Sequence, residues 1–443
     1  MRKFDSVGVA VPDILLPKKD FDYSKWAVVA CDQFTSQPEY WEEVATIVGD
    51  APSTLNLIYP EVYLGEDKPE DRIASIRSSM TALLDKDQLV EQKGFVYIER
   101  ETADNVRKGL VLCIDLEAYD YHRGAESLIR ATEGTILERI PPRVKIRKGA
   151  KLELPHIMIL IDDPDNRVLG PLTASTTRME RLYDFDLMKG SGHLSGYRVN
   201  QEFLEKGVIE ALMSLADREA FKKKYELDQD LPVLLFAMGD GNHSLATAKA
   251  IWEEIKDLGG DDVMSNPARH ALVELVNLHD DALIFEPIHR VIFDIKDGRD
   301  LLEEMKTYYG DRYASTVVSS AGEVKEAVHA QEARSHKIGY IHAGEYGYVT
   351  ISRPESNLAV GSLQLFLDKF LQDQGAREID YVHGADPVFD LGNKKNNIGF
   401  YLPAMDKHDL FKTVILDGAL PRKTFSMGEA EEKRFYMECR RIG

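Results

Sequence analysis

The chain has 443 residues, a length that favours two or three structural units over a single core. Hydrophobic residues make up 44% of it, which predicts a packed globular protein, and the net charge of −20 disfavours DNA or RNA as the main partner. The three cysteines form no Cys-x-x-Cys pair and no run reaches the ~20 apolar residues that span a bilayer, so the sequence predicts a cytoplasmic protein without a membrane anchor, a disulfide framework or a zinc cage.

Apolar runs alternate with amphipathic segments along the chain, which predicts an α/β (α+β) fold. Residues 26–31 predict a strand that leads through a polar loop into a helix beginning at Pro38. Further strands are predicted at 95–99, 109–116, 156–161 and 232–238, and a helix from Asn242 to about Leu258. We expect an N-terminal α/β region over 1–279 and an additional C-terminal α/β unit over 280–443.

The sharpest motif is Gly239-Asp240-Gly241-Asn242-His243-Ser244, where a predicted buried strand becomes a helix. Backbone N–H groups and the positive end of the helix dipole point out of such a turn and favour an anion, and glycine lets a phosphate approach the backbone. Asp240 could orient a metal or accept a proton, and His243 could donate to a phosphate or shuttle a proton. A strand-to-helix turn also needs glycine and a capping residue for structural reasons alone, so both interpretations stay open.

A second candidate is the cation-rich stretch 121–151, which includes Arg130 and Arg139. In a chain of strongly negative net charge, such a concentration of cations could form a phosphate-binding wall, because arginine grips phosphate oxygens with two parallel hydrogen bonds. The alternative interpretation is a solvated surface stretch.

Two further segments place polar side chains next to predicted strands. Residues 31–37 follow the strand at 26–31, at the strand end where α/β folds bind ligands, and Asp32 is their candidate catalytic carboxylate by position. Residues 421–426 bring Lys423 and Thr424 close together, either as ligands of an anion or as part of a basic strand that balances nearby acids. No HExxH motif and no His/carboxylate cluster at zinc spacing is present, so no metal ligand is assigned.

Five segments resemble, in order and over nearly the whole chain, a large prokaryotic family known as the domain of unknown function number 1015. They are WAVVACDQFTSQPEYW, HRGAESLIRATEGT, DGNHS, NLHDDALIFEPIHRVI and LPRKTFSM. Many members carry Asp-Gly-His-His-Arg at the strand-to-helix turn, a signature similar to that of the free serine kinases, archaeal enzymes that phosphorylate L-serine with ADP. The resemblance implies a ParB/sulfiredoxin-like mixed-sheet core in which this turn binds nucleotide phosphates.

Residue by residue, the resemblance matches Asp240, Gly241 and His243 to the Asp, the Gly and the second His of the family pattern. Lys423 and Thr424 are similar to a late Pro-Lys-Thr segment near the substrate phosphate. The first His of the pattern is Asn242 here and its Arg is Ser244. Because this change removes the arginine fork from the turn, cations such as Arg130, Arg139 or Lys423 would have to replace it.

The resemblance therefore implies a nucleotide-dependent phosphotransferase that acts on a small molecule, such as a hydroxy amino acid. ADP or ATP, with Mg²⁺, would bind through Gly239, Gly241, Asn242, Ser244 and the cations, while Asp240, His243 and Asp32 would take catalytic roles. Two alternatives stay open, a nucleotide-binding sensor without acceptor chemistry and a non-catalytic scaffold. The sequence leaves the oligomeric state open, with a homo-oligomer among the outcomes.

Overall fold

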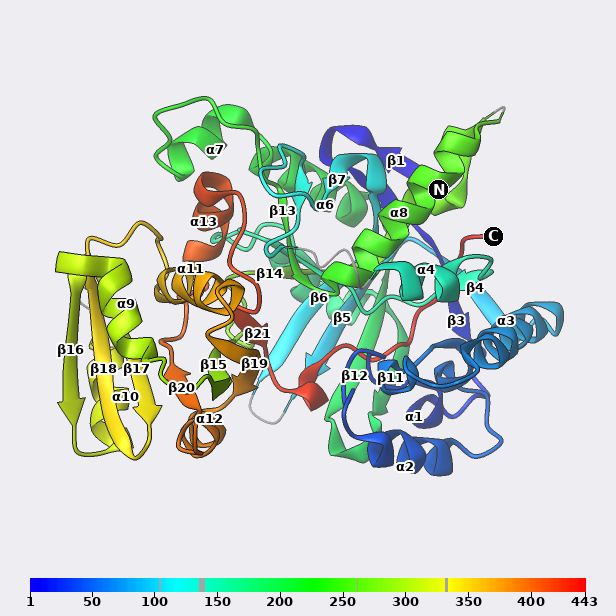
Figure 1. Cartoon of the computed structure of the whole chain (residues 1–443). Coiled ribbons are helices and arrows are strands. Elements are labelled where there is room, and N and C mark those ends of the chain that lie inside the picture. Colours follow the sequence, from blue (N-terminus) through cyan, green and yellow to red (C-terminus); the bar gives the residue numbers. More distant parts are fainter. Residues whose placement is uncertain (103–104, 135–139, 261, 331–333) are drawn as a thin grey trace. The chain divides into compact units, whose positions relative to one another are not determined.

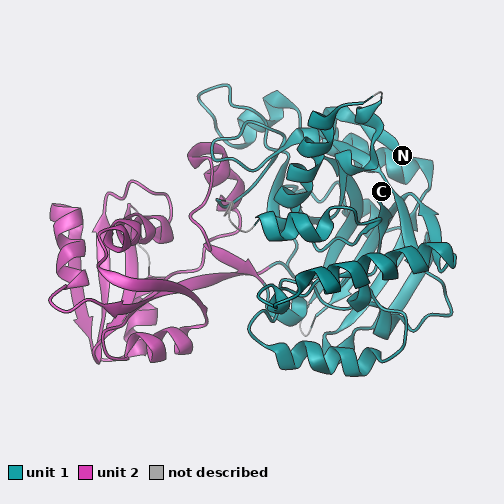
Figure 2. Cartoon of the chain, turned by 45° about the vertical axis from the view of Figure 1, so that its right-hand side comes forward, with its two compact units in different colours: residues 1–283, 428–443 teal, residues 284–427 magenta. Residues whose placement is uncertain are grey.

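A computed structural model describes residues 1–102, 105–134, 140–260, 262–330 and 334–443. They form two compact units, shown in different colours in Figure 2: residues 1–283 with 428–443 make unit 1, and residues 284–427 make unit 2. The predicted second region ran unbroken from 280 to 443, whereas residues 428–443 belong to unit 1. The reason is burial, because Phe435, Tyr436, Met437 and Cys439 lie in the hydrophobic core of unit 1.

Unit 1 is built on a mixed sheet whose strand order is β11-β12-β5-β6-β14-β10-β13-β8-β7 (Figure 1). β10 runs parallel to β14, and β8 runs parallel to β13 and β7, while the remaining neighbours in this order are antiparallel. The strands span Glu180–Asp186 (β11), His193–Val199 (β12), Phe95–Glu101 (β5), Val106–Asp115 (β6), His270–Asn277 (β14), Met158–Ile161 (β10), Phe236–Asp240 (β13), Ile129–Arg130 (β8) and Tyr119–Asp120 (β7). The mixed α/β architecture expected from the sequence is confirmed.

Shorter strands extend or flank this sheet. β1 (Arg2–Phe4) pairs with β2 (Val9–Val11), which in turn pairs with β6. β3 (Asp13–Pro17) pairs with β4 (Leu89–Lys93), and β9 (Leu152–Glu153) pairs with β22 (Arg440–Arg441). The predicted strand at 26–31 is not a strand. Its apolar residues are buried, but the backbone follows α1 (Tyr23–Trp26) and forms a single bridge, between Val29 and Phe435 of the C-terminal segment.

Alternation along β5 and β6 gives the sheet two apolar faces. Val96, Ile98, Val111 and Cys113 face one core, and Phe95, Tyr97, Leu110 and Leu112 face the other. The first core is covered by α2 (Pro38–Val48), α3 (Pro69–Asp85) and the C-terminal segment, through Trp41, Val44, Ile76, Met80 and Tyr436. The second is covered by α6 (Glu202–Leu215) and α8 (Asn242–Leu258), through Val208, Leu212, Leu245 and Trp252. Unit 1 also contains α4 (Ile140–Arg147), α5 (Gly170–Thr173) and α7 (Arg218–Lys224).

Unit 2 has a sheet of its own, entirely antiparallel, in the order β16-β18-β17-β20-β15-β19, and β21 pairs with β15 (Figure 1). The strands span Phe285–Ile295 (β15), Tyr313–Val318 (β16), Ser335–His342 (β17), Glu345–Ser352 (β18), Ala376–His383 (β19), Ile398–Tyr401 (β20) and Phe425–Met427 (β21). Helices α9 (Leu301–Tyr309) and α11 (Ala359–Gln372) pack on one core, and α10 (Ala321–His329) and α12 (Ala385–Gly392) pack on another. The last helix of the unit is α13 (Asp409–Asp417).

Not one of the described helices combines the length and the hydropathy that a bilayer-spanning helix requires.

Candidate functional site

The turn between β13 and α8 is shaped by one glycine. Gly241 has φ 81° and ψ 26°, in the left-handed region that glycine adopts without strain. A Cβ atom at this position would lie 3.0 Å from Cα of Ile157 at the start of β10. Both the dihedral angles and the close backbone approach therefore require glycine here.

The first turn of α8 begins without a side-chain cap. Gly241 is the N-cap residue, no described side chain caps the helix there, and the first turn contains no acidic residue. Asp240, one position earlier, accepts a hydrogen bond from Gly241 N at 2.8 Å through Oδ1. A helix of 17 residues thus begins beside the Asp240 carboxylate, and the positive end of its dipole favours an anion there.

Lys433 supplies a cation at this turn, and it was not among the candidate residues predicted from the sequence. Its Nζ lies 3.1 Å from Oδ2 of Asp240, and only 8% of the lysine side chain is exposed. Burial by itself would raise the pKa of Asp240, but the charge and hydrogen bond of Lys433, the nearby His156 and the Gly241 N–H hold that pKa below its ordinary value. Asp240 is therefore ionised at neutral pH and is paired with a lysine ammonium.

Asp32 is brought to the same region through His156. Nε2 of His156 lies 3.7 Å from Oδ2 of Asp32, and its Nδ1 lies 2.8 Å from the hydroxyl of Tyr436. The Tyr436 oxygen also accepts a hydrogen bond from Cys31 N at 3.1 Å. With Nδ1 of the imidazole hydrogen-bonded to the Tyr436 hydroxyl, Nε2 on the opposite side of the ring faces the Asp32 carboxylate. His156 thereby connects the loop after residue 31 with the start of β10.

A second carboxylate, Glu61, lies behind Asp32. Glu61 N donates to Cys31 O at 2.8 Å, and the Glu61 side chain accepts from Nε of Arg143 on α4 at 2.8 Å. Burial raises the pKa of Glu61; Arg143 opposes this rise, and the charge of Asp32 adds to it. Of the cation-rich stretch, Arg143 is thus the residue that the structure brings to this cluster.

A buried ionic network holds the C-terminal segment under the site. The Arg434 guanidinium donates to Pro155 O at 2.8 Å, to Glu438 at 2.5 Å and to Glu274. Glu274 also pairs with Arg107 at 3.4 Å. Arg434 follows Lys433 in the chain and donates to the residue before His156. The network therefore positions both Lys433 and His156 for their contacts at the turn.

The predicted site residues divide into three groups. Gly239, Asn242, His243 and Ser244 lie in the turn with Asp240 and Gly241, as the motif requires. Oδ1 of Asn242 is buried and has no hydrogen-bond partner among the described residues, so the carboxamide does not cap the helix. Asp32 joins this group through His156.

Arg130 is not brought to the turn. It pairs with Ala237 of β13, and its guanidinium donates to Ser127 O, Pro232 O and Val233 O at 2.8–3.1 Å, toward the start of that strand and away from Gly241. Its guanidinium satisfies backbone carbonyls and is not presented to a phosphate at the turn. Arg139 lies outside the described residues.

Lys423 and Thr424 belong to unit 2, immediately before β21. Thr424 is buried, and its hydroxyl donates to Pro421 O at 2.6 Å. Among the other described cations of 121–151, Arg147 pairs with the buried Glu153, and the exposed Lys148 pairs with Glu254. Lys148 fits the interpretation of a solvated surface stretch, whereas Arg130, Arg143 and Arg147 are largely buried.

Four residues of the site escaped the sequence interpretation: Lys433, His156, Tyr436 and Glu61. The sequence contains a signal for two of these residues, His156 and Lys433. His156 is the polar residue that directly precedes an apolar strand, and Lys433 opens a tail, KRFYMECRRI, in which charges alternate with apolar residues that turn out to be buried. Glu61 and Tyr436 carry no local signal, because their roles depend on contacts distant in the chain.

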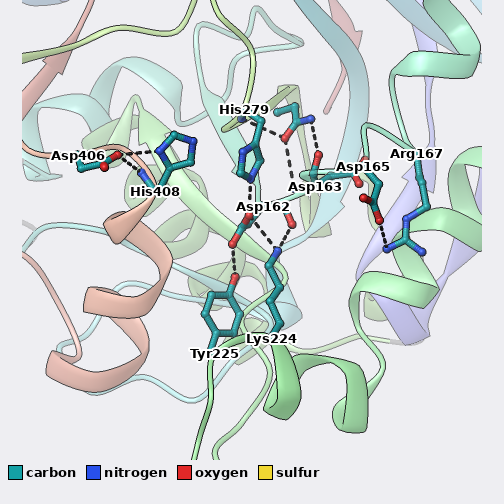
Figure 3. A network of polar contacts seen from close by, with 10 residues as sticks. Asp162, Asp163, Asp165, Arg167, Lys224, Tyr225, His279, Asp406 and His408 are labelled. Atoms are coloured by element: carbon teal, nitrogen blue, oxygen red, sulfur yellow. Dashed lines mark hydrogen bonds and ion pairs between the residues drawn. The ribbon is translucent and has the colours of Figure 1, made fainter.

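A second polar cluster lies at the opposite end of β10 (Figure 3). Asp162 follows β10 and His279 follows the parallel strand β14, so both leave the sheet at the same edge. The Asp162 carboxylate accepts from Tyr225 at 2.6 Å, contacts His279 Nε2 at 2.7 Å and pairs with Lys224 at 2.9 Å. Burial would raise the pKa of Asp162, but these three partners hold it below its ordinary value. Because the Asp162 carboxylate contacts all three of these side chains, the cluster holds the end of α7 against the sheet.

Within the described ranges, no group of three or more His, Cys, Asp or Glu side chains is arranged to hold a metal ion. A Mg²⁺ ion in proteins commonly takes only one or two carboxylates and completes its shell with phosphates and water, so a Mg²⁺ ion carried by a nucleotide would need no such group.

The sequence matches the family model described as "Protein of unknown function (DUF1015)" over residues 15–370, and the chain belongs to that family. A comparison with curated proteins gave no match. Among solved structures, the fold is similar to a conserved hypothetical protein from Pyrococcus furiosus, with 11% identity, a TM-score of 0.35 and coverage of 74% of this chain and 93% of that one.

Two further solved structures are similar at the same level. One is a free serine kinase, a glutamate-to-alanine mutant in complex with ADP, with 10% identity, a TM-score of 0.38 and coverage of 77% and 94%. The other is SbnI with a C-terminal truncation from Staphylococcus aureus, with 11% identity, a TM-score of 0.34 and coverage of 72% and 82%.

Proposed function

We propose that the protein is a nucleotide-dependent phosphotransferase that acts on a small hydroxylated molecule, with a hydroxy amino acid as the expected acceptor. The observation that carries the proposal is the largely buried Lys433–Asp240 ion pair at the start of α8, where the helix has no side-chain cap. A lysine ammonium and the N–H groups of a helix N-terminus at one point are the elements with which proteins hold phosphate. The proposal includes a ParB/sulfiredoxin-like core for unit 1 and a cytoplasmic location.

In this proposal the turn holds the nucleotide. The phosphates of ADP or ATP accept hydrogen bonds from the N–H groups of Asn242 and Ser244, with His243 beside them, and Gly239 and Gly241 keep Cβ atoms out of the way. Lys433 exchanges part of its contact with Asp240 for the terminal phosphate. A Mg²⁺ ion carried by the nucleotide would neutralise phosphate charge, with Asp240 as its nearest carboxylate.

Asp32 is the proposed base, because its carboxylate is held from both sides: Oδ1 accepts a hydrogen bond from Gln33 Nε2 at 3.0 Å, and Oδ2 lies 3.7 Å from His156 Nε2. The acceptor hydroxyl gives its proton to Asp32 as its oxygen forms a bond to the terminal phosphorus. The bond between that phosphorus and the bridging oxygen of the nucleotide breaks, and the shortened nucleotide leaves with the electron pair. Lys433 and the α8 N–H groups stabilise the charge that passes through the phosphoryl oxygens.

Turnover measured against a panel of hydroxylated acceptors tests this function. The wild-type protein is expected to convert ADP or ATP faster when L-serine or a related hydroxy amino acid is added, and Asp32→Asn is expected to lower kcat by at least about a hundredfold while KM for the nucleotide changes little. Asp165→Asn, an exposed carboxylate outside the cluster, serves as the matched control. Nucleotide conversion that no acceptor accelerates would reject the phosphotransferase.

A nucleotide sensor without acceptor chemistry is the second candidate. The observation that favours it is that Asp240 and Lys433 already neutralise each other, so a nucleotide that breaks this pair changes the contacts of the C-terminal segment. The sensor predicts nucleotide binding and a change in the hydrogen exchange of residues 428–443, with no dependence on any acceptor.

A further inference from the structure

Unit 2 contains a cavity of its own, of about 760 Å³, at one end of its sheet. The cavity lies where β17 begins, where the segment after β18 leads into α11, and where the chain leaves β20 on its way to α13. Its volume is in the range of pockets that bind small organic molecules. All of its lining residues belong to unit 2, so the cavity is distinct from the turn at Gly241.

One wall of the cavity is cationic. Arg334 and Arg353 line it from the ends of neighbouring strands, and their backbones are joined by a hydrogen bond from Arg353 N to Arg334 O of 2.9 Å. The Arg353 guanidinium also pairs with Asp311 at 2.8 Å, but both side chains are largely exposed, so a ligand can replace that partner at little cost. Leu358 and Ala359, which also line the cavity, begin the 14-residue α11, and no described side chain caps this helix.

The wall contributed by the chain after β20 is acidic. Asp406 and Asp409 line it, and Asp409 is the first residue of α13. Burial and the charge of Asp406 raise the pKa of Asp409, as expected for two carboxylates that share one region. Asp406 accepts hydrogen bonds from His408 N at 3.0 Å and from the His408 ring at 2.7 Å. A ligand ammonium placed between the two aspartates would relieve their repulsion.

A neutral imidazole lies between these walls. His336 is buried, and its Nδ1 lies 2.9 Å from Oγ of Ser362 on α11. Burial lowers the pKa of His336, so the ring carries no charge at neutral pH. Pro354, Pro403 and Met405 add apolar surface to the lining. The cavity thus has opposite charges on two walls and an uncharged middle.

We propose that this cavity binds a small zwitterion of the amino-acid class. The ligand carboxylate accepts hydrogen bonds from Arg334, Arg353 and the first N–H groups of α11, and the ligand ammonium pairs with Asp406 and Asp409. A simple anion would satisfy only the first wall and a simple cation only the second, so the two walls together select a molecule with both charges. The inference concerns a second site and does not depend on the phosphotransferase.

Isothermal titration calorimetry of the full chain tests this proposal. The probes are glycine, L-serine, L-glutamate and L-lysine, with acetate and methylamine as singly charged controls. We expect at least one amino acid to bind the wild-type protein more tightly than acetate or methylamine. We expect Arg334→Gln/Arg353→Gln and, separately, Asp409→Asn to weaken that binding by at least about tenfold. Arg377→Gln, an exposed arginine on β19 away from the cavity, is the matched control and should bind like the wild type.

Three results would overturn the proposal. The first is no binding of any probe at millimolar concentration, and the second is binding of acetate as tight as that of the best amino acid with no effect of Asp409→Asn. The third is amino-acid binding that Asp32→Asn abolishes and the double arginine variant leaves intact, because such binding belongs to unit 1. Melting curves of each variant without ligand show whether a loss of binding reflects a loss of folding.

Discussion

Lys433 and Asp240 carry the charge of the candidate site at the scale of single residues. The lysine is almost fully buried and the aspartate is about three-quarters buried, so removal of Lys433 takes the ammonium partner from a carboxylate in a desolvated place. The pair also determines in which direction the stability of the protein changes with pH. Because its pKa is lowered in the folded protein, Asp240 contributes stability above its unfolded pKa of about 3.9, and this contribution is lost as the pH falls through the folded value.

Lys433→Met should therefore lower the free energy of unfolding at pH 7 by about 1–3 kcal/mol, and the loss should shrink as the pH falls below the unfolded pKa of Asp240. Urea denaturation at a series of pH values measures both effects. Lys249→Met is the matched control, since Lys249 is a partly buried lysine on α8 that pairs with Glu253. Equal losses for the two variants at every pH would contradict the special position of Lys433.

Asp162 offers a second test at this scale. Its carboxylate joins Tyr225, His279 and Lys224, and its lowered pKa means that its contribution is present above the unfolded pKa and is lost in acid. We expect Asp162→Asn to cost about 2–3 kcal/mol at pH 7 and progressively less as the pH falls below the unfolded pKa of about 3.9, as at pH 3. Denaturation of the variant at these two pH values measures this cost. A cost that does not depend on pH would show that the carboxylate charge is unimportant.

At the scale of elements, α8 shows why some of the structure could be predicted. The sequence predicted a helix from Asn242 to about Leu258, and the structure has these bounds, because glycines at both ends bracket a stripe of Leu245, Ala248 and Trp252. Residues 26–31 were predicted as a strand for their apolar run. The burial was right, but the backbone partner is the C-terminal segment, which no local pattern reveals.

Gly241 allows a direct test of the turn. Its φ of 81° and ψ of 26° place it in the left-handed region, and a Cβ atom there would lie 3.0 Å from Cα of Ile157. Gly241→Ala should therefore cost more than the backbone strain of about 1–2 kcal/mol that a left-handed alanine carries. Thermal melting of the variant measures the loss, and a cost no larger than this strain would show that Ile157, just before β10, does not constrain the turn.

At the scale of the whole molecule, the C-terminal segment completes unit 1. Residues 428–443 supply Tyr436, Met437 and Cys439 to its core and Arg434 to its buried ionic network. Because residues 428–443 pack back onto unit 1 after the chain has formed unit 2, the site could be predicted from the sequence only in part. The motif located Asp240, Gly241 and their neighbours, and loop position located Asp32, but Lys433 and Tyr436 reach the site through long-range packing.

A chain that ends at Met427 should therefore lose the cooperative unfolding of unit 1, because the truncation leaves Glu274 buried without Arg434 and opens one face of the sheet. Hydrogen exchange read by mass spectrometry would show rapid exchange in β5, β6 and β14, while the strands of unit 2 stay protected. Protection of β14 equal to that of the full chain would contradict this account. The single substitution Arg434→Met should lower the free energy of unfolding by about 3–5 kcal/mol.

The central claim is that the turn at Gly241 and Lys433 hold the phosphates of a nucleotide. Calorimetric titration of ADP and ATP, with and without Mg²⁺, into the wild type, Lys433→Met and Lys249→Met tests it most directly. The account predicts nucleotide binding by the wild type and by Lys249→Met, and at least about tenfold weaker binding by a folded Lys433→Met variant. Binding that Lys433→Met leaves unchanged, or no binding by the wild type at millimolar nucleotide, would contradict it.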